Sequence, residues 1–276
     1  MPEQSVPEET ARTDQSGESW LEERARVGEE IIGDAGAVAL GYFDRLAELT
    51  VRSKGVQDVV SEADVAVEHL VKERLGAAFP HDAFLGEETG HADFPGSEGI
   101  WVVDPIDGTQ PFVSGLRTWC VSVAYVRDGA TVLGLVFNPA AGELFVGATD
   151  RPATLNGAEI HPSPATSVSE GLTFLGCSSR VGPEDVVPVL DRLMRRHGMF
   201  VRNGSGALGL CDVACGRLVG YVEPHINAWD CLGAVAVLEA AGARVSDYLT
   251  PETLLAGNKI VAATPAAYDE LVSILG

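Results

Sequence analysis

Two aspartates three residues apart follow an apolar run in the segment WVVDPIDGT, residues 101–109. Because Asp, Pro and Gly are common turn residues, a strand that ends in an acidic turn is the simplest interpretation. However, Glu87 also follows an apolar run, AFLG, and Asp230 lies at the start of the apolar segment AWDCLGAVAVLEAAG. Buried carboxylates are costly unless they are paired or bind a cation, and few basic residues lie nearby in sequence. A hard cation such as Mg²⁺, which prefers oxygen ligands, would resolve this conflict.

The turn after Asp104 suits a metal and phosphate site. Pro105 restricts the backbone, Gly108 allows close approach, and the amides of Gly108 and Thr109 can face an anion at the start of a short helix. Two aspartates separated by this turn can converge on neighbouring metal positions, with the carbonyl of Ile106 as a further oxygen ligand. We therefore expect a site in which metals and a phosphate meet.

Residue patterns indicate helices and one sheet in the first half of the chain. Helical spacing of apolar residues predicts helices over residues 20–49 and 65–79. Three apolar runs over residues 119–149, separated by turns at Asp128-Gly129 and Ala141-Gly142, favour an antiparallel meander. The strands expected in this half are 83–88, 100–104, 119–126, 131–139 and 143–149.

Strands and helices alternate in the second half, which favours a second α/β layer. The strands expected there are 172–179, 200–203, 219–223, 243–247 and 259–265. The helices expected there are 183–198, 207–218 and 228–242. The fold class is therefore α/β, with a disordered acidic tail over residues 1–19 and one domain over 20–276, divided into an N-terminal half to about residue 160 and a C-terminal half from 161.

Composition narrows the classes of partner. The chain has 276 residues and a net charge of −21, from 19 basic and 40 acidic residues, which disfavours binding to nucleic acid or to anionic membranes. Its five cysteines form no CxxC pair and are expected to be reduced core residues. The first residues lack the apolar core of a signal peptide, so we expect a cytoplasmic protein.

The segments GEET, WVVDPIDGT and EPHINAWDCLGAVAVLEAAG together resemble the inositol monophosphatase family of Mg²⁺-dependent, lithium-sensitive phosphatases. The resemblance runs from Trp20 to the C-terminus. It implies a layered α-β-α-β-α sandwich of the inositol monophosphatase and fructose bisphosphatase type, with the site between the sheet layers. It also implies a homodimer with two or three Mg²⁺ ions per site, replaceable by Mn²⁺, and inhibition by Li⁺.

The resemblance assigns roles to individual residues. It implies that Thr109 and Asp64 activate water, although helix N-cap roles are the simpler interpretation for both. Asp107, Gly108, Thr109 and Asp230 would also face the substrate. The metal ligands it implies are Glu87, Asp104, the carbonyl of Ile106, Asp107 and Asp230. The pocket residues it implies are Gly204, Ser205, Gly206 and Glu223, the last binding substrate hydroxyls.

The expected activity is hydrolysis of a small phosphate monoester by in-line attack of a metal-activated water, with Glu87, Thr109, Asp64 and Asp230 as the catalytic residues. Inositol or a related cyclitol or sugar phosphate ranks first as substrate. Histidinol phosphate ranks second, and a nucleotide or a biosynthetic intermediate third. Gln110-Pro111 and Ser114 depart from the usual family pattern and leave the substrate open. A noncatalytic protein that binds a phosphorylated ligand is the alternative from another class.

Overall fold

The computed structural model describes residues 19–55, 58–91 and 96–276. The expected tail therefore lies outside the described residues, except for Ser19. Ser19 caps the first helix, α1 (Trp20–Phe43), because its hydroxyl accepts the Glu22 N–H while the Glu22 carboxylate accepts the Ser19 N–H. The helix ends six residues before the expected end at Leu49, and a 3₁₀ turn, η1 (Leu46–Glu48), follows it.

The second helix, α2 (Glu62–Ala78), begins three residues earlier than expected. Ser61 is its N-cap, and Asp64 is the third helical residue of a capping box, so the N-cap role considered for Asp64 is wrong. A hairpin that the residue pattern did not predict, β1 (Val51–Gly55) with β2 (Asp58–Ser61), precedes the helix.

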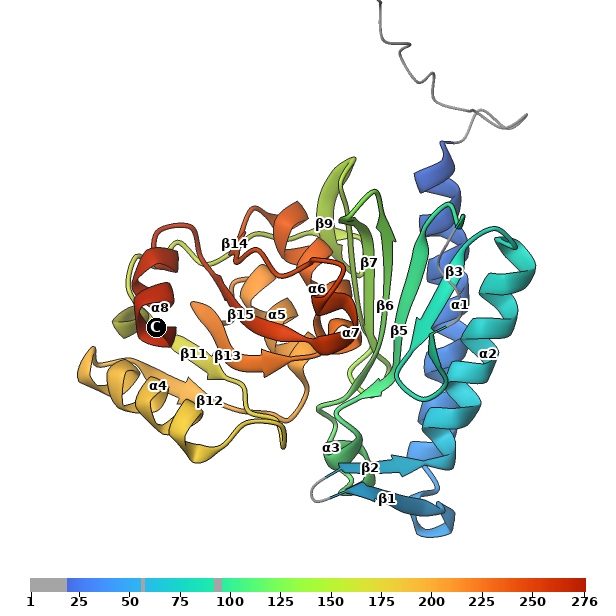
Figure 1. The fold of residues 1–276 in the computed structure, drawn as a ribbon, viewed down its shortest axis with the longest axis horizontal. Helices are drawn as coiled ribbons and strands as arrows, with labels where there is room; N and C mark the ends of the chain where they lie inside the picture. The colour runs from blue at the N-terminus through green and yellow to red at the C-terminus, as the bar shows by residue number, and fades with distance from the viewer. Residues whose placement is uncertain (1–18, 56–57, 92–95) are drawn as a thin grey trace, which may run out of the picture.

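An eight-stranded sheet, in the order β10-β9-β8-β7-β6-β5-β3-β4, forms the first half. Strands β6 to β8 form the expected antiparallel meander, β5 is antiparallel to β6, and β3 runs parallel to β5. Helices α1 and α2 cover one face of this sheet (Figure 1). Its strands are β3 (Ala83–Gly86), β4 (Gly90–His91), β5 (Ile100–Asp107), β6 (Cys120–Arg127), β7 (Ala130–Asn138), β8 (Glu143–Ala148), β9 (Arg151–Leu155) and β10 (Ala158–Glu159).

A five-stranded sheet in the order β12-β11-β13-β15-β14 forms the second half. Strand β11 is parallel to β12 and β13, whereas β15 is antiparallel to β13 and β14. A second 3₁₀ turn, η2 (Val168–Glu170), precedes β11. The strands are β11 (Leu172–Leu175), β12 (Met199–Val201), β13 (Gly220–Ile226), β14 (Arg244–Val245) and β15 (Asn258–Ala263).

Helices α5 (Gly206–Ala214) and α6 (Ala228–Ala241) lie between the two sheets, and α4 (Pro183–Arg195) and α8 (Tyr268–Leu275) cover the outer face of the second sheet (Figure 1). A short helix, α7 (Thr253–Ala256), connects β14 to β15. The expected α-β-α-β-α layering is therefore confirmed. Among the residues that the structure describes, no helix is long and apolar enough to cross a membrane.

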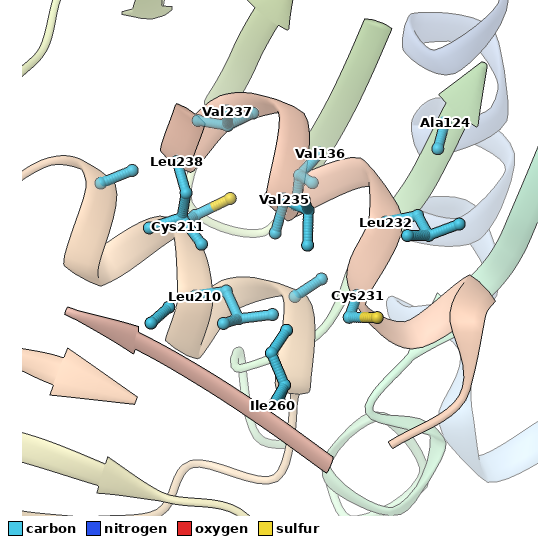
Figure 2. Packing of buried hydrophobic residues seen from close by; sticks show 14 of the residues in the cluster. Ala124, Val136, Leu210, Cys211, Cys231, Leu232, Val235, Val237, Leu238 and Ile260 are labelled. Carbon is cyan, nitrogen blue, oxygen red and sulfur yellow. The ribbon is translucent and has the colours of Figure 1, made fainter. Parts of the chain in front are cut away.

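Helix α6 lies directly against the first sheet because two strands carry glycine at the contact. A Cβ added to Gly134 of β7 would clash with the carbonyl oxygen of Gly233, and one added to Gly147 of β8 would clash with the α6 backbone at Val237. Figure 2 shows part of the apolar cluster around α5 and α6, with Leu210 on α5 and Leu232 on α6. Cys120, Cys211 and Cys231 are free thiols in the core as expected, whereas Cys177 and Cys215 are only partly buried.

Candidate active site

An irregularity in β5 brings the two aspartates of the turn onto one side of the strand. Asp104 pairs with Ser122 and Asp107 with Cys120, so three steps along β5 correspond to two steps along β6. Residues three apart point to opposite faces of a regular strand, and the extra residue of a bulge removes that opposition. The carboxylate oxygens of Asp104, Asp107 and Asp230 consequently lie within 4.8 Å of one another.

Asp230 reaches this group from the first turn of α6. It is the third helical residue, and its Oδ2 atom accepts the Asn227 backbone N–H at 3.2 Å and the Asn227 side-chain amide at 2.9 Å. The close packing of α6 on β7 and β8 brings its N-terminus to the end of β5. The sheet and the helix thus each contribute to one acidic cluster.

The electrostatics of this cluster favour a bound cation. Burial, followed by the charges of Glu87, Asp107 and Asp230, raises the pKa of Asp104 well above its ordinary value. Burial and Asp230 raise the pKa of Asp107 to about 7, and burial raises the pKa of Asp230. None of the described arginines or lysines forms an ion pair with these three carboxylates. Two buried aspartates and one partly buried aspartate that repel one another are oxygen donors that fit a divalent metal ion.

Glu87 and Ile106 lie beside the three aspartates. Glu87 is not part of the 4.8 Å group, but its charge raises the pKa of Asp104, and its backbone N–H bonds to Val103 O at 3.2 Å. The backbone N–H of Ile106 donates to Asp104 Oδ1 at 2.9 Å, which orients that carboxylate. All five groups implied as metal ligands therefore come from the ends of β3 and β5 and the start of α6.

Asp107 is fixed by the N-terminus of α5. Its Oδ2 atom accepts the Ser205 hydroxyl at 2.6 Å and the Ala207 N–H at 2.7 Å, and its Oδ1 atom accepts the Gly206 N–H at 3.3 Å. Ser205 is completely buried and also caps α5 by accepting the Leu208 N–H. Its hydroxyl therefore contacts a carboxylate of the cluster as well as bordering the pocket where it was expected.

Thr109 and Asp64 are in contact beside the turn that follows β5. The Thr109 hydroxyl is 3.2 Å from Asp64 Oδ1 and 3.1 Å from Ile106 O. Thr109 is the first residue of a short helix, α3 (Thr109–Val113), and Gly108 is its N-cap, so the N-cap role considered for Thr109 is wrong. Gly108 has φ of +94°, and an added Cβ would lie 2.9 Å from Thr118 O, so this position requires glycine.

A pocket of about 140 Å³ opens beside Asp107 and Asp230. Gly204, Ser205 and Gly206 line it as expected, and so does Glu223. Glu223 is buried and accepts the Tyr221 hydroxyl, and burial raises its pKa to about 8. The lining also contains residues that the sequence did not assign to the pocket: Cys177, Ser178 and Arg202.

Arg202 is exposed and donates to the Cys177 carbonyl at 2.9 Å, while its charge lowers the pKa of Glu223. Because Arg202 directly precedes the NGSG segment, which was expected to line the pocket, the sequence could have identified it as a pocket residue. The departures Gln110, Pro111 and Ser114 lie in or just after α3 and outside the pocket lining. Gln110 and Ser114 are exposed, whereas Pro111 is buried against Gly204.

The layered fold, with a carboxylate cluster and a polar pocket between its sheets, defines a class of metal-dependent phosphatases. The family model described as inositol monophosphatase family matches residues 20–275, and the chain belongs to that family. It is accordingly a phosphoric monoester hydrolase.

Individual relatives span nearly the whole chain. The inositol-1-monophosphatase of Synechocystis is 32% identical over 260 residues, 94% of this chain and 89% of that protein. The histidinol-phosphatase of Chlorobaculum parvum is 32% identical over 249 residues, 90% of this chain and 94% of that protein. The crystal structure of the extragenic suppressor protein SuhB from Bartonella henselae superposes with a TM-score of 0.84 at 27% identity, covering 91% of this chain and 97% of that one.

Proposed function

We propose that this protein is a Mg²⁺-dependent phosphatase of small polyhydroxylated phosphate esters. The observation that supports this proposal most directly is the acidic cluster beside the pocket. Asp104, Asp107 and Asp230 offer oxygens within 4.8 Å of one another without a basic partner among the described residues. Two of them also line a pocket that contains Glu223.

The proposed metal ligands are Glu87, Asp104, the carbonyl of Ile106, Asp107 and Asp230. When bound, the cations would neutralise phosphate charge, make a nearby water more acidic and stabilise the leaving alkoxide. We assign the orientation of that water to the Thr109 hydroxyl, and Asp64, 3.2 Å away, would accept a proton through it. Burial raises the pKa of Asp64, which makes it a better proton acceptor than an exposed aspartate.

Glu223 and Arg202 would select the leaving group. A buried carboxylate accepts hydrogen bonds from the hydroxyls of a cyclitol or sugar, and the Arg202 guanidinium offers donors in the same pocket. Histidinol phosphate is the second candidate, supported by the 32% identity to a histidinol-phosphatase. Its ammonium group would pair with Glu223 only once that side chain loses its proton, and Arg202 would repel it, so we rank it below a polyol phosphate. A nucleotide or biosynthetic intermediate ranks third.

Several further features of the proposal rest on family resemblance. They are two or three Mg²⁺ ions per site, replacement of Mg²⁺ by Mn²⁺, inhibition by Li⁺ and a homodimer. A cytoplasmic location and a single domain over residues 20–276, with its two halves, are proposed from the sequence itself. Each can be measured separately from the substrate.

A phosphate-release assay over a panel of esters tests the function. The panel contains inositol, sugar, histidinol and nucleotide monophosphates, each with Mg²⁺, with a chelator and with Mg²⁺ plus Li⁺. We expect Mg²⁺-dependent release that is fastest with inositol or a sugar phosphate. Faster release from histidinol phosphate would favour the second candidate, and release that persists in the chelator would refute the metal-dependent mechanism.

A further inference from the structure

A buried glutamate of α2, Glu68, contacts the loop that follows β3. Its side chain is completely buried, yet it takes no part in the chemistry described above. Its Oε2 atom accepts the Glu88 N–H at 2.8 Å, and its Oε1 atom accepts the Thr89 N–H at 2.8 Å. One carboxylate therefore binds two consecutive backbone amides directly after Glu87. Hydrogen bonds from amides to a charged acceptor are among the stronger ones in proteins.

Gly86 provides independent evidence that this contact is built into the fold. A Cβ added to Gly86 would lie 2.5 Å from the carboxylate carbon of Glu68 and 2.5 Å from its Oε2 atom. Gly86 does not have a positive φ, so its backbone conformation does not require glycine. The missing side chain instead leaves the space that the Glu68 carboxylate occupies.

The loop is then fixed at successive residues from two sides. The Glu87 N–H bonds to Val103 O of β5 at 3.2 Å, and the next two amides bond to Glu68. The Glu87 carboxylate must consequently project from a backbone with little freedom to move. Glu68 also lies one helical turn after Asp64, which contacts Thr109. The buried face of α2 therefore contacts both the loop after β3 and the turn after β5.

We propose that Glu68 is a positioning residue, which holds the loop after β3 so that Glu87 is preorganised to bind metal. This inference rests on the proposed function, because it takes Glu87 as a metal ligand. Glu68 itself touches neither metal nor substrate. Preorganised ligands avoid the entropic cost of ordering a loop on binding, so loss of this contact should weaken metal binding.

The test compares Glu68→Gln with Glu73→Gln, the same substitution at an exposed position of the same helix. Glutamine keeps the size of the side chain but presents an amide group to one of the two N–H donors. In the metal-free full chain, we expect faster hydrogen exchange over residues 86–90 in Glu68→Gln only. In titrations with Mn²⁺ alone, we expect about a tenfold larger Kd for Glu68→Gln and no change for Glu73→Gln.

Gly86→Ala should reproduce both effects, because it displaces the same carboxylate from the opposite side. Excess Mg²⁺ should restore kcat in Glu68→Gln, since the ligands remain present. Unchanged exchange over residues 86–90 would overturn the positioning role, as would faster exchange with an unchanged Mn²⁺ Kd. Failure of the unaltered protein to bind Mn²⁺ would instead overturn the proposed function, while the exchange data would still decide whether Glu68 holds the loop.

Discussion

Replacing Asp104 by Asn should make the metal-free protein more stable while it abolishes stabilisation by Mg²⁺. Asn keeps the shape of Asp and an oxygen that can accept the Ile106 N–H, which bonds to Asp104 Oδ1 at 2.9 Å. It removes a buried charge that faces Asp107 and Asp230. A carboxylate retained for metal binding is thus expected to lower the free energy of unfolding when no metal is bound.

The size of the expected change in the free energy of unfolding follows from the separation of the charges. Two unit charges 4.8 Å apart repel by about 3.5 kcal/mol at an effective dielectric constant of 20. Partial protonation relieves some of this repulsion, so we expect a gain of about 2 kcal/mol at pH 8, or roughly 5 °C in Tm. Mg²⁺ at a hundred times its Kd should add about 2.7 kcal/mol to the unaltered protein and little to the variant.

The stability gained by Asp104→Asn should increase with pH. The pKa of Asp104 is raised by folding from its ordinary value of 3.8. A raised pKa means that the unfolded chain binds fewer protons than the folded one, so stability falls as pH rises through the folded pKa. The advantage of Asp104→Asn should therefore be near zero at pH 4 and largest at pH 8.

Urea unfolding in a chelator, at pH values from 4 to 8, measures this difference. Asp247→Asn is the matched control, because it removes one charge from an exposed aspartate. The reasoning is refuted if Asp104→Asn is no more stable than Asp247→Asn at pH 8, or if Mg²⁺ stabilises it as much as the unaltered protein.

Three further substitutions test other parts of the site. Thr109→Ala should lower kcat about a hundredfold in the phosphate-release assay, and Thr109→Ser should restore most of the activity; equal loss in both would contradict a role for the hydroxyl. Gly134→Ala should lower the free energy of unfolding by about 2 kcal/mol in urea because it pushes α6 from the sheet, whereas Gly76→Ala, with open space around it, should raise it slightly. Glu223→Gln should raise KM for a polyol phosphate about tenfold without changing Mn²⁺ affinity, and an unchanged KM would exclude it from substrate binding.

Most elements follow from residue patterns, because each depends on local periodicity. The apolar runs at 131–139 and 143–149, separated by a turn, form neighbouring strands of the meander, and the apolar segment after Asn227 forms a helix as expected. The acidic residues at the ends of these elements also indicate where a metal site can form. These predictions need no knowledge of how distant segments pack.

The remaining features depend on contacts between distant residues. The β5 bulge that brings Asp104 and Asp107 together arises from register with β6, and Gly134 acquires its role only against α6. In the sequence Glu68 is indistinguishable from an exposed helical glutamate, because its burial depends on the space that Gly86, a distant residue, leaves for its carboxylate. The expected start of α2 is wrong for a related reason: SEAD contains two acceptable N-cap residues, and the preceding strand ends at Ser61, which selects the first.

The Pro111 departure illustrates why the substrate question is separate from the metal site. Proline is tolerated in the first turn of α3, where its missing N–H would have no helical partner. Its ring packs against Gly204, since a Cβ there would lie 2.5 Å from Pro111 Cγ. Gly204 in turn lines the pocket beside Arg202. The altered turn therefore contacts the pocket lining through Gly204, whereas the aspartates of the acidic cluster come from β5 and α6, so a change at Pro111 is expected to affect the choice of substrate more than metal binding.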